Sequence, residues 1–132
     1  MVRLMVRVRL RTPDGWSEGR AALVDTGAPY CLLPRSVWSG VEHRFLSPRD
    51  VRVAGVGSGT TAARYGEVTL VLEDGEVASP PLHVRAFLLQ DDSEPLLLGF
   101  EHLLARAILH SDYPRQVAYI EFSGGHGPAA RT

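Results

Sequence analysis

The stretch ALVDTGAPYCLLP, residues 22–34, places an acid, a hydroxyl and a glycine inside an otherwise apolar segment. Leu23 and Val24 precede Asp25, and residues 30–33 resume the apolar pattern after a short break. A carboxylate between two apolar strands is either an ordinary turn residue or an acid held near a core, where its surroundings make it chemically useful. The remainder of the sequence has to distinguish these two interpretations.

Length and composition limit the classes of protein to consider. The chain has 132 residues, of which 45% are apolar and 22% are charged, as in one soluble globular domain. Its net charge of −1 gives no electrostatic basis for binding nucleic acid, which requires a basic surplus or patch. We therefore expect no nucleic-acid partner.

Membrane and secretion signals are not evident. No apolar run approaches the length of a membrane span, and arginines interrupt the first ten residues, so we expect neither a membrane partner nor a secretion signal. The single Cys31 cannot form a disulfide within the chain, so the fold does not depend on an oxidising compartment. We expect a cytoplasmic protein.

The first third of the chain predicts a hairpin that leads to Asp25. Apolar residues alternate with Arg and Met over residues 2–11, which indicates a strand with one solvated face. Residues 12–15 form a Thr-Pro-Asp-Gly turn, and a second strand over residues 16–24 follows. Residues 34–40 favour one helical turn, and residues 41–50 a loop.

The later sequence predicts further short strands. Residues 51–56 and 67–72 enclose a centre rich in Gly, Ser and Thr, which indicates a hairpin with a flexible tip. Strands are expected at 84–89, 95–98 and 117–122, a helix at 100–107, and a disordered tail at 123–132. Many short strands with one late helix predict an all-β barrel or sandwich.

Three segments together resemble the retropepsin-like aspartic proteases, a family of single-domain retroviral and related cellular proteases. Asp25-Thr26-Gly27-Ala28 between two apolar strands resembles their active-site loop. The glycine-rich hairpin resembles the flap that closes over the substrate, and residues 96–100, LLLGF, resemble the segment that packs behind the catalytic loop. The resemblance implies a closed acid-protease barrel lobe with one short C-terminal helix over residues 1–122, followed by a flexible tail at 123–132.

The resemblance implies an aspartic endopeptidase in which Asp25 supplies a catalytic carboxylate. Thr26 can fix the loop by hydrogen bonding, and Gly27 lets the main chain bend and approach a ligand. This hydrolysis needs two carboxylates, one to activate water and one to polarise the scissile carbonyl. The sequence contains no second Asp-Thr-Gly or Asp-Ser-Gly, so the second Asp25 must come from another copy in a homodimer.

The expected substrate is a peptide or protein that the flap covers. The residues expected to bind it are the glycines of the hairpin and several apolar residues, namely Ala28, Val53, Gly55, Val56, Gly57, Gly59 and Leu89. Pro29 and Tyr30 stand where retroviral members commonly carry acidic residues, and Glu101 stands where many relatives carry Asp or Asn. These departures leave the catalytic role intact and place the substrate preference in question.

Other interpretations remain open or are disfavoured. A protease-like dimerisation or peptide-binding module without turnover is the alternative function. A phosphate-binding loop at residues 55–61 is disfavoured because no Lys follows the glycines and a strand comes next. The apolar neighbours of Cys31 predict an inert thiol, and the five His residues show no metal-ligand spacing, so we expect neither a metal nor a cofactor.

Overall fold

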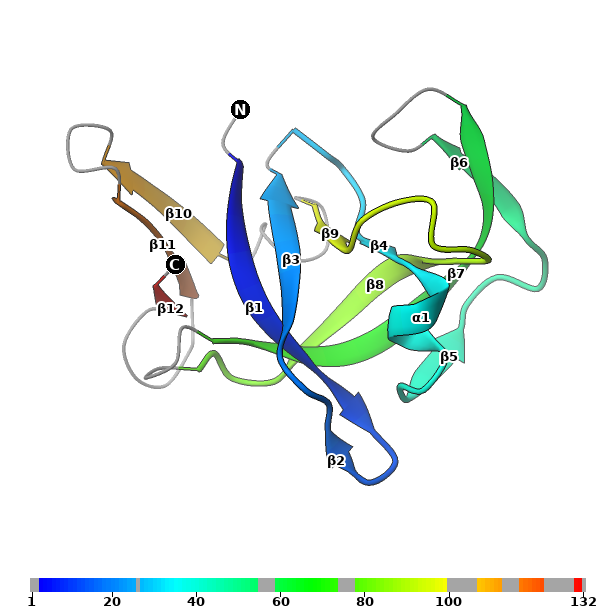
Figure 1. Ribbon diagram of the computed structural model, residues 1–132, viewed down its shortest axis with the longest axis horizontal. Helices are drawn as coiled ribbons and strands as arrows, with labels where there is room; N and C mark the ends of the chain where they lie inside the picture. Colours follow the sequence, from blue (N-terminus) through cyan, green and yellow to red (C-terminus); the bar gives the residue numbers. More distant parts are fainter. Residues whose placement is uncertain are drawn as a thin grey trace.

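The computed structural model describes residues 3–25, 27–54, 59–73, 78–99, 107–112, 117–122 and 130–131. Most of these residues lie in strands, and the described part of the chain contains one short helix, so the protein is all-β (Figure 1). In chain order the elements are β1 (Arg3–Thr12), β2 (Gly15–Trp16), β3 (Arg20–Asp25), β4 (Leu32–Leu33), α1 (Arg35–Trp38), β5 (His43–Phe45), β6 (Val51–Ala54), β7 (Thr60–Glu73), β8 (Leu82–Leu89), β9 (Leu97–Leu98), β10 (Ala107–Asp112), β11 (Val117–Phe122) and β12 (Ala130–Arg131).

Nine of these strands form one sheet. Its order is β2-β1-β3-β9-β4-β8-β7-β5, β6 pairs with β7, and β1 also pairs with β7. Strands β10, β11 and β12 form a second sheet, which lies at the left in Figure 1. The pairing of β1 with both β3 and β7 makes the first strand a link between the segment that carries Asp25 and the long strand β7.

The alternation predicted for the first strand is confirmed where side chains are described. Val6, Val8 and Leu10 are buried, whereas Arg7 and Arg11 on the other face are exposed. The predicted second strand is interrupted, because β2 ends at residue 16 and β3 begins at residue 20. The chain then runs through β3 directly to Asp25, as the sequence predicted.

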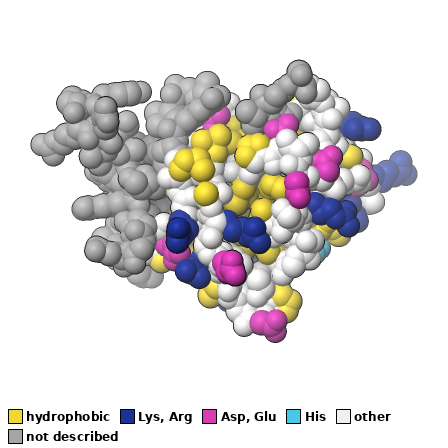
Figure 2. Space-filling view, in the orientation of Figure 1, with side chains coloured by type: hydrophobic (Ala, Val, Ile, Leu, Met, Phe, Trp, Pro, Cys, Tyr) yellow, Lys and Arg dark blue, Asp and Glu magenta, His cyan; other side chains and the backbone are white. Residues whose placement is uncertain are grey.

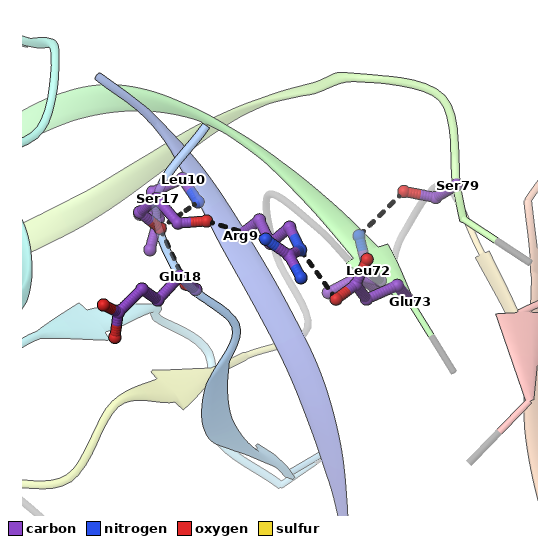
Figure 3. A network of polar contacts seen from close by, with 7 residues as sticks. All are labelled: Arg9, Leu10, Ser17, Glu18, Leu72, Glu73 and Ser79. Carbon is purple, nitrogen blue, oxygen red and sulfur yellow. Dashed lines mark hydrogen bonds and ion pairs between the residues drawn. The ribbon is translucent and has the colours of Figure 1, made fainter. Parts of the chain in front are cut away.

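Two serines complete the backbone hydrogen bonding where strands end (Figure 3). The amide of Ser17 donates to the Leu10 carbonyl at 2.8 Å, and its hydroxyl accepts from the Leu10 amide at 3.0 Å. Ser79 makes the same pair of contacts with Leu72, at 2.8 and 2.9 Å. Each serine thus satisfies a donor and an acceptor that a continued strand would otherwise pair.

The apolar side chains form two clusters on opposite sides of the strands. The larger cluster is the main core. Neighbouring residues of a strand belong to different clusters, because side chains alternate between the two faces of a strand. The main core comprises Val6, Val8, Leu10, Ala22, Val24, Cys31, Leu33, Val37, Val41, Val68, Leu70, Leu72, Leu82, Val84, Ala86, Leu88, Leu96 and Leu98. The smaller cluster comprises Leu32, Val53, Ala63, Leu89 and Leu97, with Leu23, Ala28 and Phe87 packed against it. We call this smaller group the site cluster.

The glycine-rich hairpin is confirmed, with a longer second strand than predicted. Strand β7 begins at Thr60 rather than at Glu67, and the register pairs Ala54 with Thr60 and Val51 with Ala63. The Thr and Ala residues expected in the tip are therefore part of the strand, because they pair with β6. The tip itself, residues 55–58, lies outside the described residues.

The segment 41–50, expected to be a loop, contains the edge strand β5. This strand approaches β7 at Gly66, where an added Cβ would lie 3.0 Å from the Arg44 carbonyl oxygen. Helix α1, which confirms the predicted helical turn, precedes it, and Trp38 donates its indole hydrogen to the Leu89 carbonyl at 2.8 Å. The Trp38 ring also contacts His43 and Phe45 edge-on.

The C-terminal predictions are covered only in part. The strand over 117–122 is confirmed, and the preceding strand β10, which pairs with it, was not expected. The helix expected at 100–107 falls largely on residues outside the described ranges. Within the predicted tail, residues 130–131 pair with β11. In the part of the chain that is described, no helix is long and apolar enough to cross a membrane.

Candidate active site

Asp25 is the last residue of β3 and, among the residues whose burial is described, one of three buried polar ones, with only 6% of its surface exposed. Its Oδ1 accepts a hydrogen bond of 2.8 Å from the amide of Gly27, and its carbonyl accepts one of 3.1 Å from the amide of Ala28. These two contacts form a tight turn directly after the strand. The carboxylate is therefore held by the backbone that follows it, and it does not point freely into solvent.

Strand β9 lies between the two strands that flank this turn. It runs parallel to β3, with Leu23 opposite Leu97, and antiparallel to β4, with Leu32 opposite Leu97. The Leu23 amide also donates to the Leu96 carbonyl at 2.9 Å. The strands before and after Asp25 are thus both hydrogen-bonded to one central strand, which fixes the width of the turn between them.

Gly99 follows this central strand and lies against the back of the turn. A Cβ built at Gly99 would stand 2.1 Å from the carbonyl oxygen of Tyr30 and 2.7 Å from that of Ala28. Only a glycine allows two stretches of backbone to approach this closely. The predicted packing of the LLLG segment behind the Asp-Thr-Gly turn agrees with this arrangement.

Cys31 joins the same contact from inside the core. The Gly99 amide donates to its Sγ at 3.4 Å, and the side chain is buried. Burial raises the pKa of the Cys31 thiol from 9.0 to about 11, although the Gly99 hydrogen bond acts in the opposite direction. The thiol is consequently protonated at neutral pH, which agrees with the inert packing residue that the sequence predicted.

The face of the sheet on which Asp25 lies is apolar. Residues two apart on a strand share a face, so Asp25 lies on the same side of β3 as Leu23, whose side chain packs against the site cluster. Val24 between them belongs to the main core. The acid therefore ends a strand whose inward face rests on the main core and whose other face borders the site cluster.

The structure brings together three of the four apolar residues predicted to bind substrate. Val53 and Leu89 are buried members of the site cluster, and Ala28 packs against it half-buried. Of these three, only Ala28 offers surface to a ligand in the described chain. Gly59 lies exposed at the end of the hairpin with φ of +97°, a conformation that L residues rarely adopt. Thr26, Gly55, Val56 and Gly57 lie outside the described residues.

Several residues around the turn were not predicted as part of the site. Leu23, Leu97 and Phe87 contribute to the cluster beneath the turn, and Tyr30 contacts Phe87. The position of Leu23 two residues before Asp25 was a usable signal, because the alternation of a strand places both on one face. The approach of Phe87 depends on the register between distant strands, and no local pattern indicates it.

The hairpin and the Asp25 turn lie at the same end of the molecule in Figure 1, and β2 lies at the other. Figure 2 shows hydrophobic side chains gathered over the upper part of this face, with arginine side chains below and to the right of them. Among the residues with described positions, no three His, Cys, Asp or Glu side chains form a group that could hold a metal ion.

No family model and no curated protein sequence matches this chain.

Proposed function

We propose that this chain is one subunit of a homodimeric aspartic endopeptidase with a retropepsin-like barrel lobe. The observation that carries the proposal is the position of β9 between β3 and β4, with Gly99 against the turn that begins at Asp25. This arrangement holds a nearly buried carboxylate at a fixed place beside an apolar face. The pairing of β1 with both β3 and β7 supports a barrel that closes on itself.

In the proposed mechanism, Asp25 from each of two subunits faces a common water molecule. One carboxylate takes a proton from the water as its oxygen attacks the scissile carbonyl carbon, and the other, protonated, donates a hydrogen bond to the carbonyl oxygen. The tetrahedral intermediate then collapses as the first carboxylate passes the proton that it took from the water to the peptide nitrogen, and the C–N bond breaks. The turn contributes by holding the carboxylate in place, so little reorganisation is needed during the reaction.

The proposed substrate is an extended peptide that lies between the Asp25 turn and the glycine-rich hairpin. The hairpin is well suited to cover it, because β6 and β7 are paired up to Ala54 and Thr60 and the site cluster includes Val53 of β6 and Ala63 of β7. The paired part of the hairpin is thus anchored in the same apolar cluster that borders the acid. Closure over the peptide would exclude bulk solvent from the site and leave the one attacking water between the two carboxylates.

The test is hydrolysis of an unbiased peptide library by the purified protein between acidic and neutral pH. We expect cleavage by the wild-type protein and loss of at least about a hundredfold in activity for Asp25→Asn, which removes the proton transfer. Asp14→Asn is the matched control, because Asp14 is an exposed turn residue at the other end of the first hairpin. Peptides that carry a statine-type hydroxyl should inhibit, because they imitate the tetrahedral intermediate.

The alternative is a peptide-binding or dimerisation module of the same fold without turnover. The presence of Pro29 and Tyr30 after the turn, where retroviral members commonly carry acidic residues, favours it. Cleavage that survives Asp25→Asn would refute the protease mechanism. Peptide binding with no cleavage across the library and the whole pH range would favour the module.

A further inference from the structure

Three aromatic side chains form a continuous strip that starts at the Asp25 turn. The rings of Tyr30 and Phe87 meet edge to face, with centroids 5.0 Å apart and an interplanar angle of 86°. The rings of Phe87 and Tyr65 lie 5.2 Å apart at 50°. The strip therefore connects the turn with β8 and β7. We refer to these three residues as the aromatic strip.

The backbone explains why residues so far apart in sequence meet. Tyr65 and Phe87 are directly opposite each other in the β7–β8 ladder. The Phe87 amide donates to the Cys31 carbonyl at 2.9 Å, which brings the preceding Tyr30 alongside. The contact is thus fixed by two main-chain pairings and does not depend on the side chains alone.

The aromatic strip lies on the face of the sheet that borders Asp25. Phe87 and Leu89 are two residues apart on β8 and share a face, and Leu89 is a member of the site cluster. Tyr65 and Ala63 are likewise two residues apart on β7 and share a face, and Ala63 is also a member of the site cluster. Phe87 itself packs against the cluster. The strip is therefore a lateral continuation of the apolar surface beside the acid.

Tyr30 is the accessible member of the strip. It is 43% exposed, whereas Phe87 and Tyr65 are half-buried beneath and beside it. An aromatic ring prefers an edge-to-face or offset partner, and this strip offers ring faces and edges with no charged side chain among its members. A large apolar or aromatic side chain would gain contact there, whereas a charged one would lose hydration without an ionic partner in the strip.

We propose that the aromatic strip is a subsite for an aromatic or large apolar side chain of the peptide, and that Tyr30 determines this preference. The inference rests on the proposed peptidase function, because it takes the peptide to lie beside Asp25. An extended peptide directs alternate side chains to one face, so a side chain a few residues from the cleaved bond reaches the strip. One added aromatic contact corresponds to about a three- to tenfold preference.

The first arm of the test compares cleavage profiles of the wild-type protein, Tyr30→Ala and Tyr30→Phe. We expect enrichment of Phe, Tyr, Trp or Leu at one fixed position near the cleaved bond. For a peptide pair that differs only by Phe or Ala there, kcat/KM should favour Phe about three- to tenfold. Tyr30→Ala should bring this ratio close to one, and Tyr30→Phe should retain it.

The matched control is Trp16→Ala, which removes an aromatic ring of similar exposure, 40%, from β2 at the other end of the molecule. It should leave the Phe-to-Ala ratio unchanged. Thermal unfolding of each variant checks that it is folded. Tyr30→Phe keeps the ring contact with Phe87, so a preference that is lost in Tyr30→Ala and kept in Tyr30→Phe would be due to the aromatic ring.

The second arm measures binding without turnover. Fluorescently labelled decapeptides, in which Phe replaces each position of a poly-Ala-based parent in turn, are titrated with Asp25→Asn protein and with Asp25→Asn/Tyr30→Ala protein. Cleavage without a Tyr30-dependent preference would overturn the subsite and leave the peptidase function standing. Tyr30-dependent binding of Phe peptides without any cleavage would overturn the peptidase function and leave the subsite. Absence of both would overturn both.

Discussion

The backbone at Gly99 lies so close to Tyr30 that a Cβ at Gly99 would stand 2.1 Å from the Tyr30 carbonyl oxygen. This contact joins the end of β9 to the turn that presents Asp25, 74 residues earlier in the chain. Because both partners are main chain, neither can move aside as the end of a flexible side chain could. A side chain at residue 99 would therefore displace the turn that positions Asp25.

Gly99→Ala should destabilise the protein strongly. The added methyl group must displace the Ala28–Tyr30 backbone, and overpacking of this kind costs about 1–3 kcal/mol or more in the free energy of unfolding. Gly40→Ala is the matched control, since a Cβ at Gly40 meets nothing within 4 Å. Denaturant unfolding of both variants measures the difference. Equal stability of the two variants would show that the close approach is absent in solution.

Asp25→Asn should lower the activity of the wild-type protein when the two proteins are mixed. If subunits exchange freely, an equal amount of the variant leaves roughly half of the wild-type activity, because half of the wild-type subunits then occupy mixed dimers. An equal amount of Asp14→Asn should instead add activity. Native mass spectrometry of the mixture, with one of the two proteins isotopically labelled, checks that subunits have exchanged. Activity unaffected by Asp25→Asn under exchange would argue against a shared site.

Cys31 should resist thiol reagents in the folded protein and react once it is unfolded. Burial raises the pKa of its thiol to about 11, so almost no thiolate exists at pH 8. The raised pKa has a consequence for stability, since the folded protein holds this proton more tightly than the unfolded chain does. The stabilisation is complete below pH 9.0 and is lost as the pH rises from there to about 11.

The comparison is Cys31→Ala, measured by denaturant unfolding between pH 8 and pH 11. Tyrosine ionisation affects both proteins alike, so the difference between their slopes isolates the thiol. The wild-type protein should lose about 2 kcal/mol more than Cys31→Ala across this range. Parallel slopes, or rapid labelling of the folded protein at pH 8, would contradict the burial of Cys31.

Two ion pairs on β1 should differ measurably in strength. Arg9 Nε lies 2.8 Å from Glu73 Oε1, with 18% of the Glu73 side chain exposed, whereas Arg11 lies 3.9 Å from Glu42 and both side chains are 53% exposed (Figure 3 shows the first pair). Double-mutant cycles to Ala should give a coupling of about 0.5–1 kcal/mol for Arg9 with Glu73 and close to zero for the other pair. Added salt should weaken the first coupling. Equal couplings would contradict this geometry.

The sequence predicted the elements that have a strong local period. The alternation in residues 2–11 indicated β1, which spans Arg3–Thr12, and the short strand expected at 117–122 has the bounds of β11. It missed β5, because the three residues of that strand are all exposed and show no apolar alternation. This strand forms because Gly66 on β7 allows it to approach, which is a property of its neighbour and not of its own sequence.

The candidate site likewise combines features that local sequence indicates with features that depend on distant strands. The Asp-Thr-Gly turn and the LLLG segment were visible in the sequence as separate motifs. Their contact was expected only from the family resemblance and not from any local pattern, because it depends on β9 pairing with β3 in one direction and with β4 in the other. The strip formed by Tyr65, Phe87 and Tyr30 likewise depends on the register between β7 and β8, which brings together rings that are 22 residues apart in sequence.

The sequence by itself determined that an acid would end an apolar strand at a tight turn, since Asp25 and the glycine after it are set by local chain chemistry. It also determined that one chain carries one such turn. Only the tertiary structure decided what surrounds the acid. The strand inserted behind it, the glycine that touches its turn and the aromatic strip beside it come from long-range pairings, whose register is chosen by how all the strands bury their apolar faces together.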